Sequence, residues 1–237
     1  MSLILCIETE TDVCSVALAR DGQLVSLRES PEGRDHARQV AVYADEVIRA
    51  GGVTPCDLDA VAIGQGPGSY TGLRIGTSFA KGMCYALGIP LVAIGSLRSM
   101  ANIGAEEHRE GRVSEPDWAG ARLCPMIDAR RMEVYAQVFD TSLTPLSEVV
   151  AEVVTPESFS EFTGNGHELI IFGNGARKCI DILPSEHVRM IEVSPSARGI
   201  CWDAHIKLTA GEVEDIAYFE PLYLKDFVVT TSKKKLF

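Results

Sequence analysis

The residues best suited to chemistry lie in a glycine-rich loop at residues 66–76, whose sequence is GPGSYTGLRIG. An apolar run at residues 61–63 leads into this loop, and a helical pattern follows it from residue 69 to residue 87. Glycine and proline let the backbone turn tightly before the helix, so that free N–H groups point toward a ligand above the turn. Such a turn can bind a phosphate group.

The helix behind the loop carries small residues at four-residue spacing, Gly72, Gly76 and Ala80. Residues spaced in this way share one helical face, so they leave a shallow groove with few side chains. Each helical glycine costs about 1 kcal/mol relative to alanine. The repeated cost indicates that another element packs very close to this face. That element is either the chain's own sheet or a second subunit.

The chain contains two similar units. Residues 3–8 and 123–128 are each an apolar strand that ends in one carboxylate, Glu8 or Asp128, and a second strand follows each of them. Further along each unit, an apolar strand enters a Gly-x-Gly turn. This repetition predicts an α/β protein with two related lobes.

We place the boundary between the lobes at the start of the polar stretch 104–121. Residues 1–103 then form the N-terminal lobe with the helices for dimerisation, and residues 104–237 form the C-terminal lobe, whose last segment can pack back on the first. Hydrophobic periodicity and turn residues predict strands at 3–7, 13–19, 23–28, 60–63, 91–94, 123–127, 133–139 and 169–172, and helices at 34–50, 69–87 and 195–208.

Bulk properties exclude several classes of protein. The formal net charge of −11 argues against a nucleic-acid-binding body, and three lysines at 233–235 are interpreted as a solvated tail. Seven scattered cysteines without a Cys-x-x-Cys pair predict reduced, buried thiols in a cytoplasmic protein. The longest uncharged apolar stretch, residues 85–97, is interrupted by glycine and proline, so the sequence predicts no membrane span.

Four segments together resemble the TsaB (YeaZ) family. They are the N-terminal ILCIETETDVCSVAL, His36 early in the next helix, the loop GPGSYTGLRIG and the later MIDARRMEVYAQVF. The resemblance covers residues 3–139, and it extends more loosely to PLYL at residues 221–224. It implies the actin/hexokinase/Hsp70-like (ASKHA) fold and a role beside the catalytic protein TsaD in forming threonylcarbamoyladenosine on tRNA. The partners that it implies are a TsaB homodimer, a heterodimer with TsaD, and TsaE, with tRNA reached only through the complex.

The metal motif of the catalytic relative TsaD is missing. TsaD carries His-x-x-x-His after the strand that corresponds to residues 91–94, and two histidines at this spacing can bind one metal ion from one helical face. In this chain the matching positions are Ser96 and Met100, and Arg98 between them would add positive charge beside a cation. We therefore predict no metal and a partner that is not itself an enzyme.

The resemblance also points to a degenerate nucleotide cleft, formed by Glu8, Thr9, Glu10, Asp128 and Arg130. In nucleotide-binding members of the fold, a carboxylate and a glycine-bearing hairpin in each lobe hold the phosphates. Both hairpins here lack the glycine, and Glu10 brings like charge toward a phosphate. We predict no cofactor, with vestigial ATP or ADP binding as the alternative because arginine can bind phosphate.

The leading hypothesis is docking through the helices at 34–50 and 69–87, which would pack with the same pair from a second chain. One surface would serve both the homodimer and the TsaD heterodimer, so the two would compete. On this hypothesis Gly76→Leu weakens both assemblies while the monomer stays folded. The predicted interface residues are His36, Val40, Tyr43, Val47, Tyr70, Gly72, Leu73, Gly76, Phe79, Ala80 and Met83.

Two other classes of function remain open from the sequence. The wider family has been labelled glycopeptidase, but Ser69 lacks a Gly-x-Ser-x-Gly elbow and is better interpreted as a helix N-cap. An autonomous ATPase or sugar kinase of the same fold would need an aspartate base and intact phosphate loops. Asp128 is the candidate base, but no glycine follows it in its hairpin.

Overall fold

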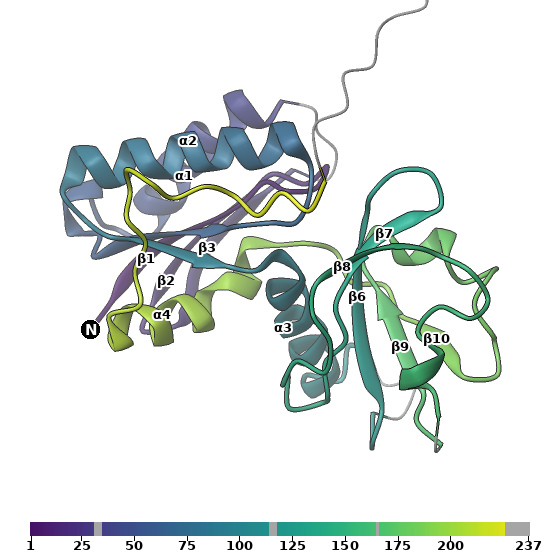
Figure 1. The fold of residues 1–237 in the computed structure, drawn as a ribbon. Helices are drawn as coiled ribbons and strands as arrows, with labels where there is room; N and C mark the ends of the chain where they lie inside the picture. The colour runs from purple at the N-terminus through teal and green to yellow at the C-terminus, as the bar shows by residue number, and fades with distance from the viewer. Residues whose placement is uncertain (31–34, 114–117, 165, 226–237) are drawn as a thin grey trace, which may run out of the picture.

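The computed structural model describes residues 1–30, 35–113, 118–164 and 166–225, and they form two lobes (Figure 1). Each lobe is built on a five-stranded mixed sheet. Within these segments no helix has both the length and the apolar sequence needed to cross a bilayer. The three lysines at 233–235 lie outside the described residues.

The sheet of the first lobe has the strand order β3-β2-β1-β4-β5. Strand β1 pairs antiparallel with β2 and parallel with β4, and β4 pairs parallel with β5. The strand bounds are β1 Leu3–Glu8, β2 Ser15–Arg20, β3 Gln23–Glu29, β4 Ala60–Gly64 and β5 Leu91–Ile94.

The sheet of the second lobe repeats this topology, because its order is β8-β7-β6-β9-β10 when it is followed in the same direction. Its first strand, β6, is also antiparallel to the next strand and parallel to the fourth. The prediction of two related α/β lobes is therefore confirmed. The bounds are β6 Arg122–Asp128, β7 Glu133–Ala136, β8 Val150–Val153, β9 Leu169–Phe172 and β10 Val188–Met190.

Helices cover both faces of the first sheet. Helices α1 (His36–Ala50) and α2 (Tyr70–Leu87) pack on one face, and α4 (Cys201–Ala210) packs on the other (Figure 1). Strand β1 is buried along its whole length because helices cover it from both sides, and this explains its continuous apolar sequence. The 3₁₀ helices are η1 Pro55–Asp57, η2 Ser160–Phe162, η3 Ala176–Lys178 and η4 Ala197–Ile200.

Helix α3 (Ser96–Arg109) lies between the lobes (Figure 1). The sequence boundary after residue 103 falls inside this helix, because the polar residues that follow form its last turns. After the second sheet the chain returns to the first lobe, where η4 and α4 pack against β1 and β2. The helix predicted at 195–208 begins as the 3₁₀ turn η4, and the strand predicted at 133–139 ends at Ala136.

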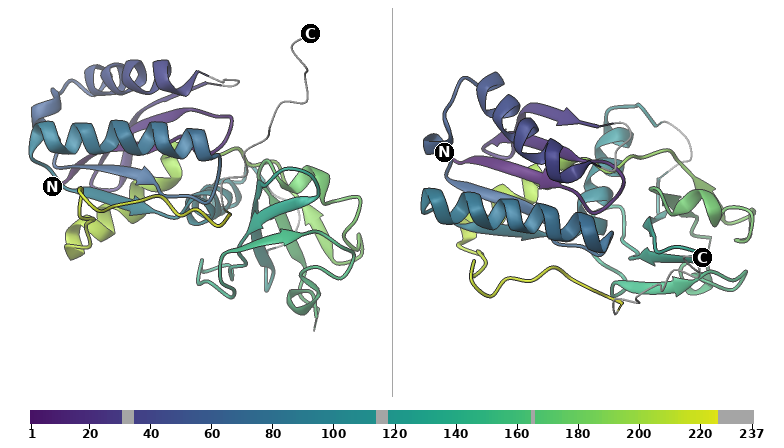
Figure 2. Two further views of the ribbon diagram at one scale, coloured as in Figure 1. Left: turned by 45° about the horizontal axis from the view of Figure 1, so that its top comes forward. Right: turned by 90° about the horizontal axis from the view of Figure 1, so that it is seen from above.

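A C-terminal strap, residues 214–225, runs beside α2 toward the second lobe (Figure 2). Lys81 of α2 donates to the carbonyl oxygens of Ala217 and Phe219 at 3.4 and 3.0 Å. Near the end of the strap, the N–H of Leu222 donates to the carbonyl oxygen of Gln65, next to the glycine-rich loop, at 2.8 Å. Lys225 forms an ion pair with Glu133 of the second lobe. The strap therefore links the glycine-rich loop to the second sheet.

The seven cysteines all lie in the described segments, and all seven are free. Six are buried, so the prediction of buried thiols is confirmed for these six. Cys56 is exposed because it lies in the short turn η1, which has no buried residue.

Candidate functional site

The small-residue face of α2 packs inside the first lobe, and it is not an open groove. A methyl group added to Gly72 would overlap the carbonyl oxygen of Thr9, and one added to Gly76 would overlap the Thr9 hydroxyl and lie 3.0 Å from Ile63. Ala80 is fully buried in the same core. The assignment of these three residues to a docking surface is therefore wrong. The close neighbour that the glycines require is the loop after β1, in the chain itself.

Four other predicted interface residues are also buried within the lobe. Val40, Val47 and Leu73 belong to the core, each at most 2% exposed. His36 is buried too, and its Nε2 donates to the carbonyl oxygen of Thr11 at 2.9 Å. These side chains hold α1 and α2 on the sheet, so little of their surface is open to a partner. The partly exposed members of the predicted set are Tyr43, Tyr70, Phe79 and Met83.

A groove between α1 and α2 remains open on the outer side of these helices. Its volume is about 350 Å³, and its lining is Ala37, Val40, Arg74, Ile75, Ser78 and Phe79. Sequence reasoning identified only Val40 and Phe79 of this lining. The four-residue spacing of Ile75 and Phe79, one position before the glycine stripe, is the signal that could have identified the outer face.

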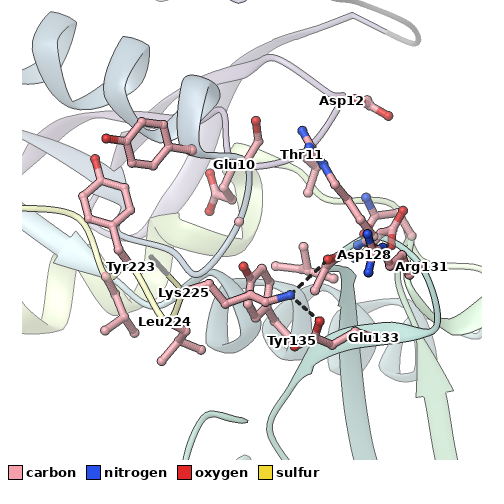
Figure 3. Close-up of a pocket in the computed structure, with 18 residues that line it drawn as sticks. Glu10, Thr11, Asp12, Asp128, Arg131, Glu133, Tyr135, Tyr223, Leu224 and Lys225 are labelled. Atoms are coloured by element: carbon pink, nitrogen blue, oxygen red, sulfur yellow. Dashed lines mark hydrogen bonds and ion pairs between the residues drawn. The ribbon is translucent and has the colours of Figure 1, made fainter. Parts of the chain in front are cut away.

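A cleft of about 680 Å³ lies between the lobes (Figure 3). Tyr223, Leu224 and Lys225 of the strap form one side, and the hairpin between β6 and β7 faces them. The ring of Tyr223 lies 5.0 Å from that of Tyr70 at the start of α2. The cleft residues are Glu10, Thr11, Asp12, Gly68, Ser69, Tyr70, Ile127, Asp128, Ala129, Arg130, Arg131, Glu133, Tyr135, Asn174, Leu222, Tyr223, Leu224 and Lys225.

Three backbone amides around the glycine-rich loop of the first lobe already have partners. The N–H of Thr9 donates to the Glu10 carboxylate at 2.8 Å, and the N–H of Ser69 donates to the Glu10 carbonyl oxygen at 2.6 Å. The N–H of Gly66 donates to the Ser96 hydroxyl at 3.0 Å. The Ser69 hydroxyl accepts from the N–H of Gly72 at 3.3 Å, which confirms Ser69 as the N-cap of α2.

The matching hairpin in the second lobe is closed by its own side chains. Lys178 pairs with Asp128 and also donates to the carbonyl oxygens of Arg131 and Glu133, the latter two at 2.8 and 2.7 Å. Arg130 and Arg131 adopt φ angles of +70° and +50°, a region that favours glycine. Their side chains are exposed at the mouth of the cleft. The residues present therefore do not fit a phosphate-binding hairpin.

The position of the TsaD metal motif is filled by packing in this chain. The Ser96 hydroxyl accepts from the N–H of Gly66 in the glycine-rich loop. Met100 is 1% exposed and packs so closely on Gly173 that no side chain would fit at position 173. Arg98 pairs with Asp203 of α4 at 2.8 Å and also donates to the carbonyl oxygen of Leu143. Among the described residues no three histidine, cysteine or acidic side chains gather as metal ligands would.

Two lobes of one topology with a cleft between them define a protein of the ASKHA fold. The activator of the 2-hydroxyisocaproyl-CoA dehydratase from Clostridium difficile, solved with bound ADPNP, shares this fold. Its TM-score is 0.52 at 10% identity, over 90% of this chain and 98% of that chain. YeaZ from Pseudomonas aeruginosa is more similar, with a TM-score of 0.78 at 25% identity over 94% of this chain and 100% of that chain.

Sequence comparisons identify the family. The family model described as TsaD, tRNA N6-adenosine threonylcarbamoyltransferase, matches residues 30–167. The tRNA threonylcarbamoyladenosine biosynthesis protein TsaB of Haemophilus influenzae is 33% identical over 159 residues, which are 67% of this chain and 58% of that protein. TsaB of Escherichia coli is 27% identical over 231 residues, 95% of each chain. The chain belongs to the TsaB (YeaZ) family.

Proposed function

We propose that this chain takes part in threonylcarbamoyladenosine biosynthesis on tRNA as a non-catalytic partner of TsaD. The observation that carries the proposal is the combination of TsaB family membership with a helix α3 that has Ser96 and Met100 in place of the metal-binding histidines. Met100 packs in the interior, and Arg98 forms an ion pair between helices. These residues support a structural role for α3 in this chain.

The experiment that tests this proposal is co-purification with a TsaD protein, followed by a tRNA modification assay. With a threonylcarbamoyl donor supplied, we expect modification with TsaD, TsaE and this chain together, and a loss of at least tenfold when this chain is left out. The chain incubated with TsaE and tRNA in the absence of TsaD should give no product. Modification without TsaD would contradict the non-catalytic role.

We propose the groove between α1 and α2 as the surface that binds TsaD, and as the surface of a competing homodimer. Ile75 and Phe79 supply apolar area there, and both pack partly on the core, which holds them in place. Exposed Arg74 at the rim lies 4.1 Å from the centre of the Tyr70 ring. An apolar centre with a polar rim suits a protein partner. TsaE would join through the assembled pair, and tRNA would be reached through the complex.

Ser78→Arg tests this surface without entering the core. Ser78 is exposed and lines the groove, so the substitution should leave the monomer folded. In a complex formed through this groove, the charge of the new arginine would be buried at a cost. We expect the dissociation constants of both the homodimer and the TsaD complex to rise at least tenfold, measured by analytical ultracentrifugation. Tyr85→Arg, at the exposed end of the same helix and outside the groove, is the matched control. Equal constants for the two variants would reject the surface.

We also infer that the cleft is a degenerate nucleotide site without a working cofactor. The partners already held by the amides of Thr9, Gly66 and Ser69 support this inference. We expect no measurable heat when magnesium-ATP or magnesium-ADP is titrated into the isolated chain to about 1 mM. A dissociation constant on the order of 1 mM corresponds to the weakest useful affinity. Magnesium-dependent turnover of ATP by the isolated chain would instead support the kinase or ATPase alternative.

A further inference from the structure

Two buried acidic side chains lie together beside the cleft. Glu8 is the last residue of β1 and is 2% exposed, while Glu10 follows in the next loop and is 1% exposed. Glu10 also belongs to the cleft lining. Neither residue has a role in the docking surface proposed above, so their burial needs a separate explanation.

Glu10 is held by close contact with two glycines. A methyl group added to Gly64 would overlap the Glu10 carboxylate, and one added to Gly68 would lie 2.5 Å from its Cβ. The Glu10 backbone is bound as well, through the N–H of Ser69 at 2.6 Å. The glycine-rich loop therefore closes over Glu10, and the start of α2 depends on the position of this side chain.

Polar atoms of this cluster lack hydrogen-bond partners. Within the described residues, no partner is found for Glu8 Oε2, Glu10 Oε1 or the Ser99 hydroxyl, and each of these residues is at most 2% exposed. Buried carboxylate oxygens without a donor are costly, and the cost falls when one carboxyl is protonated and can donate to its neighbour. The orphaned atoms therefore indicate a proton.

The arginine side chains of Arg98 and Arg198 on the surrounding elements are engaged elsewhere. Arg98 of α3 pairs with Asp203, and Arg198 of η4 pairs with Glu106 and Glu107. Other ionisable groups lie on the adjacent loop, on the first turns of α2 and on the facing hairpin: Asp12, Tyr70, Arg74, Asp128, Arg130, Arg131 and Glu133. Arg74 lies over the Tyr70 ring. Asp128 pairs with Lys178, and Glu133 pairs with Lys225.

Two ionised carboxylates cannot share this site at low cost. Burial raises the pKa of Glu8 well above its usual value, the neighbouring Glu10 carboxyl raises that pKa further, and the nearby Ser99 hydroxyl opposes the change. With a like charge adjacent and water excluded, the Glu8 carboxyl favours its protonated form.

We propose that Glu8 keeps its proton beside the Glu10 carboxyl at neutral pH, and that this proton keeps the wall of the cleft at Glu10 closed. Its loss places two negative charges side by side, so water must enter and Glu10 must leave its position under Gly64 and Gly68. The glycine-rich loop and the start of α2 then loosen. The acid pair makes this wall of the cleft sensitive to pH, independently of whether the chain binds TsaD.

The test is the pH dependence of unfolding in urea for the wild type and Glu8→Gln. Because the pKa of Glu8 is raised in the folded state, its contribution is fully present below the usual glutamate pKa and is lost as pH rises toward the raised value. We expect the wild-type unfolding constant to increase by up to about tenfold per pH unit above about pH 5 from this one proton. Glu8→Gln should lack that component, and the amides of its loop at residues 64–69 should show equal protection factors at pH 6 and pH 9, once the base-catalysed intrinsic exchange rates are divided out.

Glu46→Gln, which alters a surface ion pair with Arg28, is the matched control and should keep the wild-type slope. If Glu8→Gln does not fold, the carbon NMR spectrum of wild type labelled at glutamate carboxyls decides, since one carboxyl should be protonated at pH 7. All carboxyls ionised at pH 7 would overturn the proposal. So would stabilisation by added magnesium or potassium ions, because a bound cation would then replace the proton.

Discussion

Gly72→Ala is expected to destabilise the isolated monomer by about 3 kcal/mol, at the upper end of the range for overpacked sites. The added methyl group would overlap the carbonyl oxygen of Thr9 and lie 3.1 Å from its carbonyl carbon. These are backbone atoms, and the Thr9 hydroxyl is itself tied to the carbonyl oxygen of Gly72 at 2.9 Å. Neither side can move without displacing α2 from the sheet. Urea denaturation followed by circular dichroism measures the loss.

Gly82→Ala is the matched control, because Gly82 lies in the same helix with nothing within 4 Å of an added methyl group. We expect this variant to gain about 1 kcal/mol from helix propensity. Equal stability for the two variants would show that α2 does not contact Thr9 as described. Gly76 also packs against Thr9, so the sequence-based expectation for Gly76→Leu is wrong. This variant should unfold the monomer before it affects any assembly.

The fold could be predicted from the sequence because its signals are local and repeated. An apolar strand ending in Glu8 and another ending in Asp128 each begin a five-strand unit with the same order. Periodicity alone also identified α1 and α2 within two residues of their observed ends. The position of α4 was harder to predict, because helix propensity does not say to which sheet a terminal helix returns.

The site was less accessible to sequence reasoning. The stripe of Gly72 and Gly76 correctly indicated a very close neighbour, but a repeat of small residues carries no information about which element that neighbour is. Its identity depends on Thr9, a residue more than sixty positions away in the chain. The contact between Glu133 and Lys225 joins residues still further apart in the sequence, and no local pattern predicts it. Tertiary pairing of this kind has to be observed.

Arg98→Leu is expected to destabilise the chain by about 2 kcal/mol, because it removes a link between three elements. Arg98 of α3 holds Asp203 of α4 in the first lobe and the carbonyl oxygen of Leu143 in the second. In this variant the amide of Asn102 would still donate to Asp203 at 2.9 Å. The Asp203 carboxylate, whose side chain is 16% exposed, would however lose its cation. The expected loss is no larger because Arg98 itself is one-third exposed, so solvent screens the pair.

Arg49→Leu provides the comparison, since its ion pair with Asp45 lies on the surface of α1 with both side chains more than half exposed. Such a pair contributes roughly 0.5 kcal/mol or less. Hydrogen exchange should separate the two variants further. Arg98→Leu should speed exchange in both α4 and the loop around Leu143, while Arg49→Leu should affect α1 alone. Faster exchange in α4 without a change near Leu143 would mean that Arg98 stabilises the first lobe only and does not join the two lobes.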